Sequence, residues 1–238
     1  MKVHYLHDWE VTPEEAKEIQ QKLAKHVVKE NKIDVVHTVA GVDMSAPDPR
    51  GVARAAIVVL SYPELALLES QVIEEEVKFP YVPGLLSFRE SPLILAASEK
   101  LSLTPDLILV DGQGLAHPRR LGLASHLGLI WDKPVIGCAK SRLCGYHQPV
   151  GPEVGDYAQL IENGEVIGAV LRTKKDSSPL YISIGHKVDL ESALKWTLNC
   201  CRGYRLPEPT RLAHLAAGGR LKTQKSGERG YQAKFELL

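Results

Sequence analysis

The alternation of apolar and polar residues along the chain predicts helices and strands in a mixed order. TPEE at residues 12–15 forms a capping box with proline at the first helical position, and apolar residues then recur at helical spacing. The β-branched run at 34–43 predicts a strand that ends in an acidic residue, and a second apolar strand is expected at 53–60. Residues 65–77 fit either a helix or a strand, and we favour a strand because the short turns suit a meander of hairpins.

The middle of the chain has the pattern of a crossover unit. Residues 79–90 (FPYVPGLLSFRE) are expected to form a loop, followed by a helix over 93–101. DLILVD at 106–111 is apolar between its two aspartates, which is typical of a parallel strand buried on both faces. The other expected elements are a helix near 121–130, strands at 134–139, 166–172 and 180–184, and a helix that starts after Asp189 and ends near Gly203. These elements predict one α/β domain.

Composition places the chain among ordinary globular proteins. The 29 Lys+Arg residues balance 29 Asp+Glu residues in 238, which argues against an evenly basic coat protein for nucleic acid. No apolar run approaches the ~20 residues that cross a bilayer, and the first ten residues lack the apolar stretch of a signal peptide. The four cysteines are too few and too irregularly spaced for a disulfide framework. We therefore expect a reduced, cytoplasmic protein without a membrane partner.

Three carboxylates lie at the ends of predicted strands or next to a predicted helix, where catalytic residues are often found. Asp43 ends the first predicted strand, Asp111 ends the buried strand, and Glu90 precedes a predicted helix. The carboxyl ends of strands in an open α/β sheet face a common crevice, so the two aspartates can converge there. Converging carboxylates repel one another unless a cation lies between them, and oxygen ligands favour Mg²⁺ or Mn²⁺ over zinc. Taken singly, each carboxylate is better explained as the cap of its own strand or helix, and it is the convergence of all three that makes a metal site an equal alternative.

Residues near these carboxylates suggest an anionic polymer as the ligand. Gly112 and Gly114 let backbone N–H groups approach a base or a phosphate, although such glycines commonly make turns. Residues 117–147 contain five Lys+Arg and one acid, which is either a solvated face or a track for nucleic acid. The loop PYVP at 80–83 is stiffened by two prolines and projects an aromatic ring, which either packs or wedges into a base stack.

Five segments, in this order between about Val39 and His214, resemble the endonuclease V family: FPYVPGLLSFRE, LVDGQGLAHPRRLGLASHLG, IGCAKSRLCG, SIGHKVDLESAL and RLPEPTRLAH. The resemblance implies a ribonuclease H-like fold, a mixed sheet flanked by helices. It also implies that the catalytic residues are Asp43, Glu90, Asp111, Lys140 and His214, that Asp43, Asp111 and Glu90 bind the metal, that Pro80, Tyr81, Val82 and Pro83 form a DNA wedge, and that Gly84, Leu85, Gly112 and Gly114 line a base pocket. Gln113 and Cys138 depart from commoner forms of the family pattern, and neither is an implied metal ligand.

The activity that the resemblance implies is Mg²⁺-dependent hydrolysis of DNA, with Mn²⁺ as a substitute. The strand is cut at the second phosphodiester on the 3′ side of deoxyinosine or another deaminated base, leaving 3′-hydroxyl and 5′-phosphate ends. We expect a monomer, acting on such DNA and possessing one or two metal ions. Three alternatives stay open: an inosine-specific endoribonuclease, a related junction resolvase, and a non-catalytic binder of damaged or branched nucleic acid.

A single catalytic domain is expected over residues 1–238, because no repeat or low-complexity linker interrupts the chain. Its zero net charge is an average over segregated regions. Residues 61–80 carry five glutamates and one lysine, whereas 202–238 carry eight basic residues and three acids. The basic, glycine-rich tail at 216–238 is compatible with either an ordered or a flexible conformation.

Overall fold

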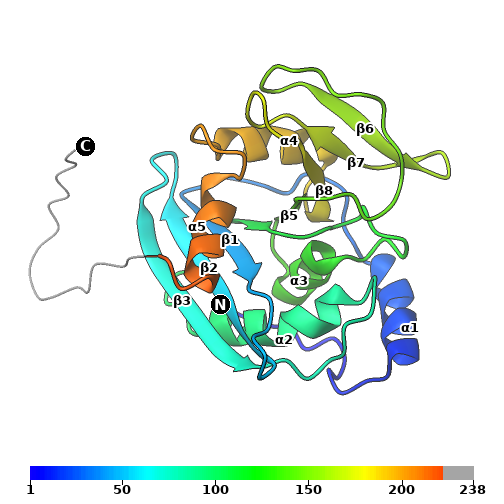
Figure 1. The fold of residues 1–238 in the computed structure, drawn as a ribbon, viewed down its shortest axis with the longest axis vertical. Coiled ribbons are helices and arrows are strands. Elements are labelled where there is room, and N and C mark those ends of the chain that lie inside the picture. Colours follow the sequence, from blue (N-terminus) through cyan, green and yellow to red (C-terminus); the bar gives the residue numbers. More distant parts are fainter. Residues whose placement is uncertain (222–238) are drawn as a thin grey trace, which may run out of the picture.

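A single sheet of eight strands runs through the computed structural model, which describes residues 1–221 (Figure 1). The strands are β1 (Thr38–Met44), β2 (Val52–Ser61), β3 (Leu67–Glu76), β4 (Leu107–Val110), β5 (Val135–Ala139), β6 (Tyr157–Glu162), β7 (Glu165–Leu171) and β8 (Leu180–His186). Their spatial order is β3-β2-β1-β4-β5-β8-β7-β6. The neighbours β1, β4 and β5 run parallel, and every other adjacent pair is antiparallel. The predicted mixed sheet is confirmed.

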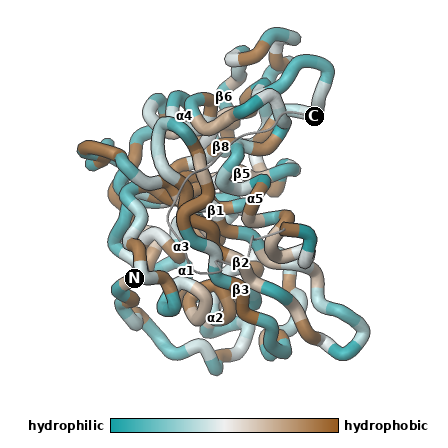
Figure 2. Tube along the Cα trace, turned by 90° about the vertical axis from the view of Figure 1, so that its left-hand side faces the viewer, coloured by the Kyte–Doolittle hydropathy of each residue, from teal (hydrophilic) through white to brown (hydrophobic). Residues whose placement is uncertain are grey.

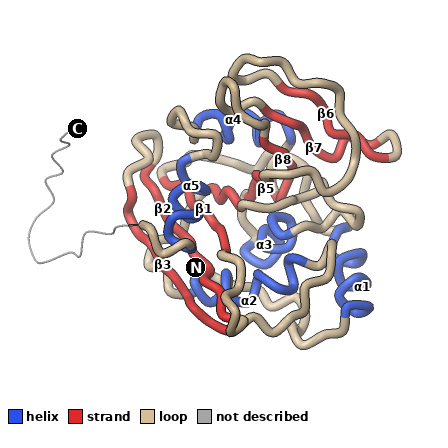
Figure 3. Tube along the Cα trace, viewed as in Figure 1, coloured by secondary structure: helices blue, strands red, loops and turns tan. Residues whose placement is uncertain are grey.

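Helices cover both faces of this sheet (Figure 3). Within residues 1–221 they are α1 (Pro13–Ala24), α2 (Leu86–Glu99), α3 (Leu123–Trp131), α4 (Leu190–Asn199) and α5 (Glu208–Ala217). One face packs against α2 and α3, the opposite face packs against α4 and α5, and α1 lies beside α3 (Figure 1). No helix in this part of the chain is long and apolar enough to cross a membrane.

The central strand β4 explains the unbroken apolar run in its sequence. Ile108 and Val110 point into the core under α2 and α3, whereas Leu107 and Leu109 point into the core on the side of α4. All four side chains are inaccessible to solvent. A strand buried on both faces has no place for alternating polar residues. Figure 2 shows the same concentration of hydrophobic chain along the neighbouring strand β1 at the centre of the molecule.

Most predicted elements are present, with shifted ends. The Thr12 hydroxyl accepts a hydrogen bond from the Glu15 backbone N–H, and the Glu15 carboxylate accepts one from the Thr12 N–H, so the capping box is confirmed. β1 begins at Thr38 rather than at residue 34, and Val35 in the preceding segment is 65% exposed. The ambiguous segment at 65–77 contains the strand β3, as favoured.

Three parts of the sequence prediction need correction. The predicted loop at 79–90 is wrong in its second half, because α2 begins at Leu86 and therefore contains Glu90. α2 starts ahead of the predicted helix at 93–101 and contains Pro92, although proline disfavours a helix interior. The strand β6 and the helix α5 were not predicted. Ala216 and Ala217, at the start of the predicted tail, belong to α5, and the tail beyond Leu221 lies outside the described residues.

Candidate metal centre and the cavity beside it

Three parallel strands end at one edge of the sheet, and each end carries a charged residue. Val42 in β1 pairs with Val110 in β4, so the residues that follow them, Asp43 and Asp111, lie next to each other. Lys140 directly follows β5, the next parallel strand, and forms an ion pair with Asp111. The two aspartates therefore lie together at this edge of the sheet, as expected from the strand ends.

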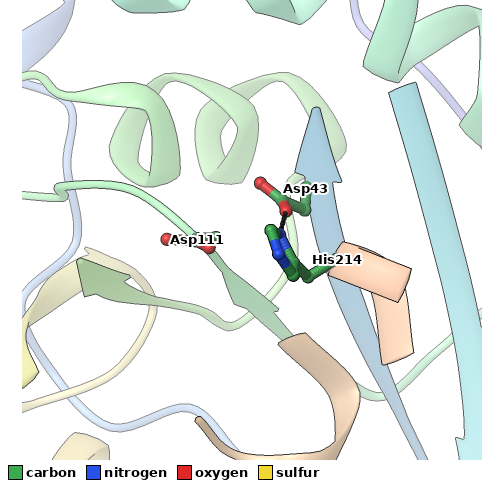
Figure 4. A group of neighbouring side chains, drawn as sticks. All are labelled: Asp43, Asp111 and His214. Carbon is green, nitrogen blue, oxygen red and sulfur yellow. Dashed lines mark hydrogen bonds and ion pairs between the residues drawn. The ribbon is translucent and has the colours of Figure 1, made fainter. Parts of the chain in front are cut away.

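His214 reaches the same edge from α5, near the other end of the chain. Its Nδ1–H donates to Asp43 Oδ2 at 2.7 Å, since a carboxylate can only accept (Figure 4). Asp43, Asp111 and His214 each offer a ligand atom, and these atoms lie within 4.8 Å of one another. Gly41 in β1 allows α5 to rest directly on the strand: a Cβ there would lie 1.9 Å from the Pro209 carbonyl oxygen.

The carboxyl groups at this centre repel one another. Burial, followed by repulsion from Asp43, raises the pKa of Asp111. Burial and then repulsion from Asp43 and Asp111 raise the pKa of Glu90, in α2, to about 8. Such a group gains stability from a counterion, and its oxygen-rich donors suit a hard divalent cation. Glu90 lies outside the compact group, which contains His214 instead, so the role of Glu90 as a ligand stays a prediction.

A cavity of about 390 Å³ adjoins the metal centre. Asp111 and Lys140 belong to its wall, together with the loop that the sequence singled out as a wedge. Residues that line it include Tyr81, Val82, Pro83, Gly84, Gly112 and Gln113. A concave space of this size can enclose a flat heterocyclic ring. The candidate wedge, the cavity and the metal centre are therefore contiguous.

Two of the four residues predicted for a base pocket line this cavity, and two do not. Gly84 and Gly112 are part of its wall. Leu85 is 1% exposed and packs in the core beneath the loop. Gly114 is pressed against β8, where a Cβ would lie 2.1 Å from the Ile184 carbonyl oxygen. Glycine at position 114 thus allows this loop to pack directly against β8.

The loop at 80–83 holds its aromatic ring in solvent. Tyr81 is 73% exposed, whereas Phe79 just before the loop is 8% exposed. Arg89 Nη1 donates to the Phe79 carbonyl oxygen at 2.5 Å, and the Leu85 N–H donates to the Val82 carbonyl oxygen at 2.9 Å. An exposed ring on a loop fixed at both ends is the geometry that a wedge requires, and this role for Tyr81 stays a prediction.

The basic stretch at 117–147 does not form one free surface, contrary to the simplest interpretation of its composition. Arg120 is engaged by Glu162 at 2.6 Å and Glu165 at 2.8 Å. Burial lowers the pKa of His117 to about 4, so this ring is neutral at neutral pH. The basic side chains of this stretch that line the cavity are those of Lys140 and Arg142. Lys140 and Arg142 therefore face the cavity, whereas Arg120 is neutralised by Glu162 and Glu165.

One residue at the cavity wall escaped the sequence analysis. Gln20 in α1 is completely buried, on the same helical face as Ala16. A polar residue on a predicted apolar face was the available signal, because buried amides need hydrogen-bond partners. Its partners are the carbonyl oxygens of Gly84 and Leu121 and the guanidinium of Arg119, and Gly84 belongs to the cavity wall.

Known proteins of similar sequence identify the family. The model of the Endonuclease V family matches residues 21–215. The chain belongs to the endonuclease V family. An endonuclease V from Dehalococcoides mccartyi is 54% identical over 217 residues, covering 91% of this chain and 97% of that protein. The family resemblance of the five sequence segments is confirmed.

Solved structures of endonuclease V share the fold. The Bacillus subtilis protein has a TM-score of 0.87 and 33% identity, covering 92% of this chain and 96% of that one. The Ciona intestinalis endonuclease V, solved with a 23-mer DNA containing an inosine followed by a ribo-adenosine, has a TM-score of 0.74 and 28% identity, covering 89% and 98%. The predicted ribonuclease H-like fold is confirmed, and the chain is a nuclease, a hydrolase of phosphodiester bonds.

Proposed function

We propose that this endonuclease V is a Mg²⁺-dependent DNA repair enzyme for deoxyinosine and other deaminated bases. It nicks the strand at the second phosphodiester bond 3′ to the lesion, leaving 3′-hydroxyl and 5′-phosphate ends. The observation that carries the proposal is the contiguity of the Asp43–Asp111–His214 group, the 390 Å³ cavity and the exposed Tyr81. Further support comes from the Ciona intestinalis relative, which was solved with inosine-containing DNA.

The donor set fits a hard divalent cation. Asp43 and Asp111 would hold it through carboxylate oxygens, and Glu90 would complete the anionic side of the site. Mutual repulsion among these carboxyls is the observation that favours a cation, because it is relieved only by protonation or by positive charge. When bound, Mg²⁺ or Mn²⁺ supplies Lewis-acid stabilisation of a phosphate and lowers the pKa of water.

Two side chains beside this centre, His214 and Lys140, can assist proton transfer and stabilise negative charge on the phosphate. The hydrogen bond between His214 Nδ1 and Asp43 Oδ2 holds the imidazole ring at the edge of the sheet. Arg220 Nη2 lies 3.4 Å from His214 Nε2, at the exposed side of the ring. In this proposal, His214 assists proton transfer at the carboxylates, because its ring is held beside them. The ammonium of Lys140, between Asp111 and the cavity, is placed to stabilise negative charge that develops on the phosphate.

Recognition in this proposal uses a base turned out of the helix. The cavity beside the metal centre receives the base, and extrusion exposes the base edges that distinguish hypoxanthine from adenine. Gly84 and Gly112 bring backbone groups close to it, and Tyr81 fills the gap left in the stack. The scissile phosphate then lies towards the carboxylates, because the cavity wall includes Asp111.

One cleavage experiment tests the proposal. Matched DNA and RNA strands with a single inosine are incubated with Mg²⁺, and the cut is mapped. We expect a nick at the second phosphodiester in DNA, loss of the nick in EDTA, and no nick by Asp43→Ala despite measurable binding of the damaged strand. Cleavage retained by Asp43→Ala would contradict the assigned site. A nick in RNA alone would indicate an endoribonuclease, and EDTA-resistant binding without any nick would indicate a binding protein.

We also propose that the enzyme works in the cytoplasm as a monomer. All four cysteines are free thiols, and Cys138 and Cys200 are buried. Burial raises the pKa of Cys200 to about 12 and that of Cys201 to about 11, so both thiols are protonated at neutral pH. Free, protonated thiols suit a reducing compartment. Sedimentation of the purified protein at micromolar concentration checks the oligomeric state.

A further inference from the structure

The carbonyl oxygen of Gly84, at the cavity rim, accepts hydrogen bonds from three side chains distant in sequence. Gln20 Nε2 donates at 3.1 Å, His117 Nε2 at 2.9 Å and Arg119 Nη2 at 2.7 Å. A carbonyl oxygen has two lone pairs, so three donors exceed its ordinary complement. The peptide at Gly84 is therefore held in place by convergent donors as well as by packing.

Two of these donors also bind each other. Arg119 Nε donates to Gln20 Oε1 at 2.5 Å, so the guanidinium spans the Gln20 amide oxygen and the Gly84 carbonyl oxygen. Gln20 Nε2 donates in addition to the Leu121 carbonyl oxygen at 3.0 Å. Both polar atoms of this fully buried side chain are thus used. We call this pair the Gln20–Arg119 clamp; it links α1 to the loop after β4 and to the turn before α2.

The third donor is a neutral histidine with a fixed tautomer. His117 Nδ1 accepts from the Arg119 backbone N–H at 3.1 Å, which leaves the hydrogen on Nε2 for Gly84. Because burial keeps the pKa of His117 far below neutrality, the ring carries no charge at the pH of the cell. The guanidinium of Arg119 is consequently the charged member of the arrangement, and charged donors make the stronger hydrogen bonds.

Gly84 is the residue type that permits this approach. Its φ of +79° lies in the left-handed region, and a Cβ would lie 2.8 Å from Arg119 Nη2. The guanidinium therefore occupies the space that a side chain at this position would need. Gly84 lies between the loop that carries Tyr81 and the first turn of α2, so fixing its peptide fixes both the exposed ring and this part of the cavity wall.

We propose that Gln20 and Arg119 are positioning residues for lesion recognition, which hold the Gly84 turn so that the Tyr81 loop and the cavity rim are formed before DNA binds. The inference rests on the proposed function. Neither residue belongs to the Asp43–Asp111–His214 group, so the clamp governs capture of the base and leaves the hydrolytic step unchanged. A preformed site binds more tightly because less conformational entropy is lost on binding.

The test uses Gln20→Met and Arg119→Met, which remove the clamp's hydrogen bonds but keep long, flexible side chains. We expect each variant to raise KM for an inosine-containing duplex roughly tenfold at unchanged kcat, the size of one charge-assisted hydrogen bond. The double variant should lose no more than the worse single variant, because the two residues act as a unit. Gln20→Glu keeps the acceptor for Arg119 and should fall between wild type and Gln20→Met. Gln21→Met, at an exposed neighbouring position, is the matched control.

Two readouts separate positioning from general stability. KM losses that add in the double variant, or equal losses in affinity for undamaged DNA, would overturn the proposal. Hydrogen exchange of the peptide spanning 80–88 is a second readout that does not depend on activity. We expect it to accelerate at least about tenfold in Gln20→Met and not in Gln21→Met, because the turn loses its anchor. Unchanged hydrogen exchange of residues 80–88 in Gln20→Met would overturn the positioning role of the clamp, even if the wild-type protein cleaves. A wild-type protein that cuts no inosine-containing strand would refute the proposed function alone.

Discussion

The metal centre and the cavity lie side by side, but the residues of each region are positioned by different interactions. Asp43 and Asp111 are brought together by strand register, and burial with repulsion from Asp43 still raises the pKa of Asp111 although Lys140 pairs with it. The cavity rim is instead fixed by hydrogen bonds within the protein that converge on Gly84. In the proposed function, hydrolysis would therefore depend on an ion taken from solution, whereas recognition would use a rim that the fold has already formed. Variants of the two regions should fail in different ways.

The largest effect is expected at the metal centre. Asp111→Asn removes a carboxylate from the cation site and should reduce the cleavage rate on the order of a thousandfold, or about 4 kcal/mol of transition-state stabilisation. Affinity for the inosine-containing strand should change less than threefold, since the cavity rim is intact. Cleavage assays measure the rate and fluorescence anisotropy measures the affinity, and Asp34→Asn, at an exposed position, is the control. A parallel loss of affinity would show that the two regions are not separable.

A change at Gly41 should affect the metal centre through the fold. In Gly41→Ala the new methyl group would collide with the Pro209 carbonyl oxygen and push α5 away from β1. We expect the free energy of unfolding to fall by about 1–3 kcal/mol, the usual range for overpacking. Cleavage should fall as well, because His214 moves with α5. Urea unfolding monitored by tryptophan fluorescence measures the first effect, and unaltered stability would mean that α5 is not seated as described.

Acid should destabilise the protein through a buried histidine. His126 is fully buried, bound to Ser87 Oγ at 3.1 Å and to His7 Nε2 at 2.7 Å, and burial lowers its pKa to about 3. Below pH ~6.5 the unfolded chain binds a proton here that the folded protein excludes, so stability falls as pH falls. The loss is about 1.4 kcal/mol per pH unit, or roughly 2 kcal/mol between pH 6.5 and 5.

The variant His126→Asn isolates this contribution. It removes the titrating ring, so its unfolding free energy should depend on pH less steeply than that of the wild type. Between pH 6 and 4 the variant should take up about one proton fewer on unfolding. Urea midpoints at pH 7, 6, 5 and 4 give the slopes. Identical slopes for the two proteins would show that His126 takes up its proton without unfolding.

The smallest effect is expected from the exposed ring at the cavity rim. Tyr81→Ala should weaken binding of an inosine-containing duplex about fivefold, or about 1 kcal/mol, the lower range for stacking of a base on an aromatic side chain. Undamaged duplex should lose less, and the unfolding midpoint should not move because the ring is 73% exposed. Tyr5→Ala, equally exposed on the N-terminal segment, is the control. Equal losses for damaged and undamaged duplex would count against a wedge.

The two regions also differ in how far the sequence predicts them. The convergence of Asp43 and Asp111 follows from strand ends, because a buried parallel strand has an unmistakable apolar sequence and its end lies at a known edge of the sheet. His214 was placed there by family resemblance only, since α5 was not expected. α5 is short and has Pro209 in its first turn, a position that proline favours, but Pro207 at its N-cap offers no capping side chain, so its start is poorly marked.

The Gln20–Arg119 clamp could not be predicted in the same way. Gln20 sits in a helix whose apolar face was predicted correctly, but which carbonyl its amide meets depends on how three separate segments pack. Arg119 was counted with the basic stretch at 117–147, where its charge suggested contact with nucleic acid. Side-chain chemistry indicates that such groups need partners, and only the tertiary fold determines which partners they find.

The hydrogen bond between Asp43 and His214 joins residues 171 positions apart, and so has a consequence for how the protein is made. A ribosome has synthesised nearly the whole catalytic domain before α5 can fold onto β1. Until then the nascent chain holds its aspartates without the histidine, and no translation product shorter than 214 residues contains the complete group. A nuclease assembled in this order acquires its cutting centre last, after the sheet that supports it has been synthesised.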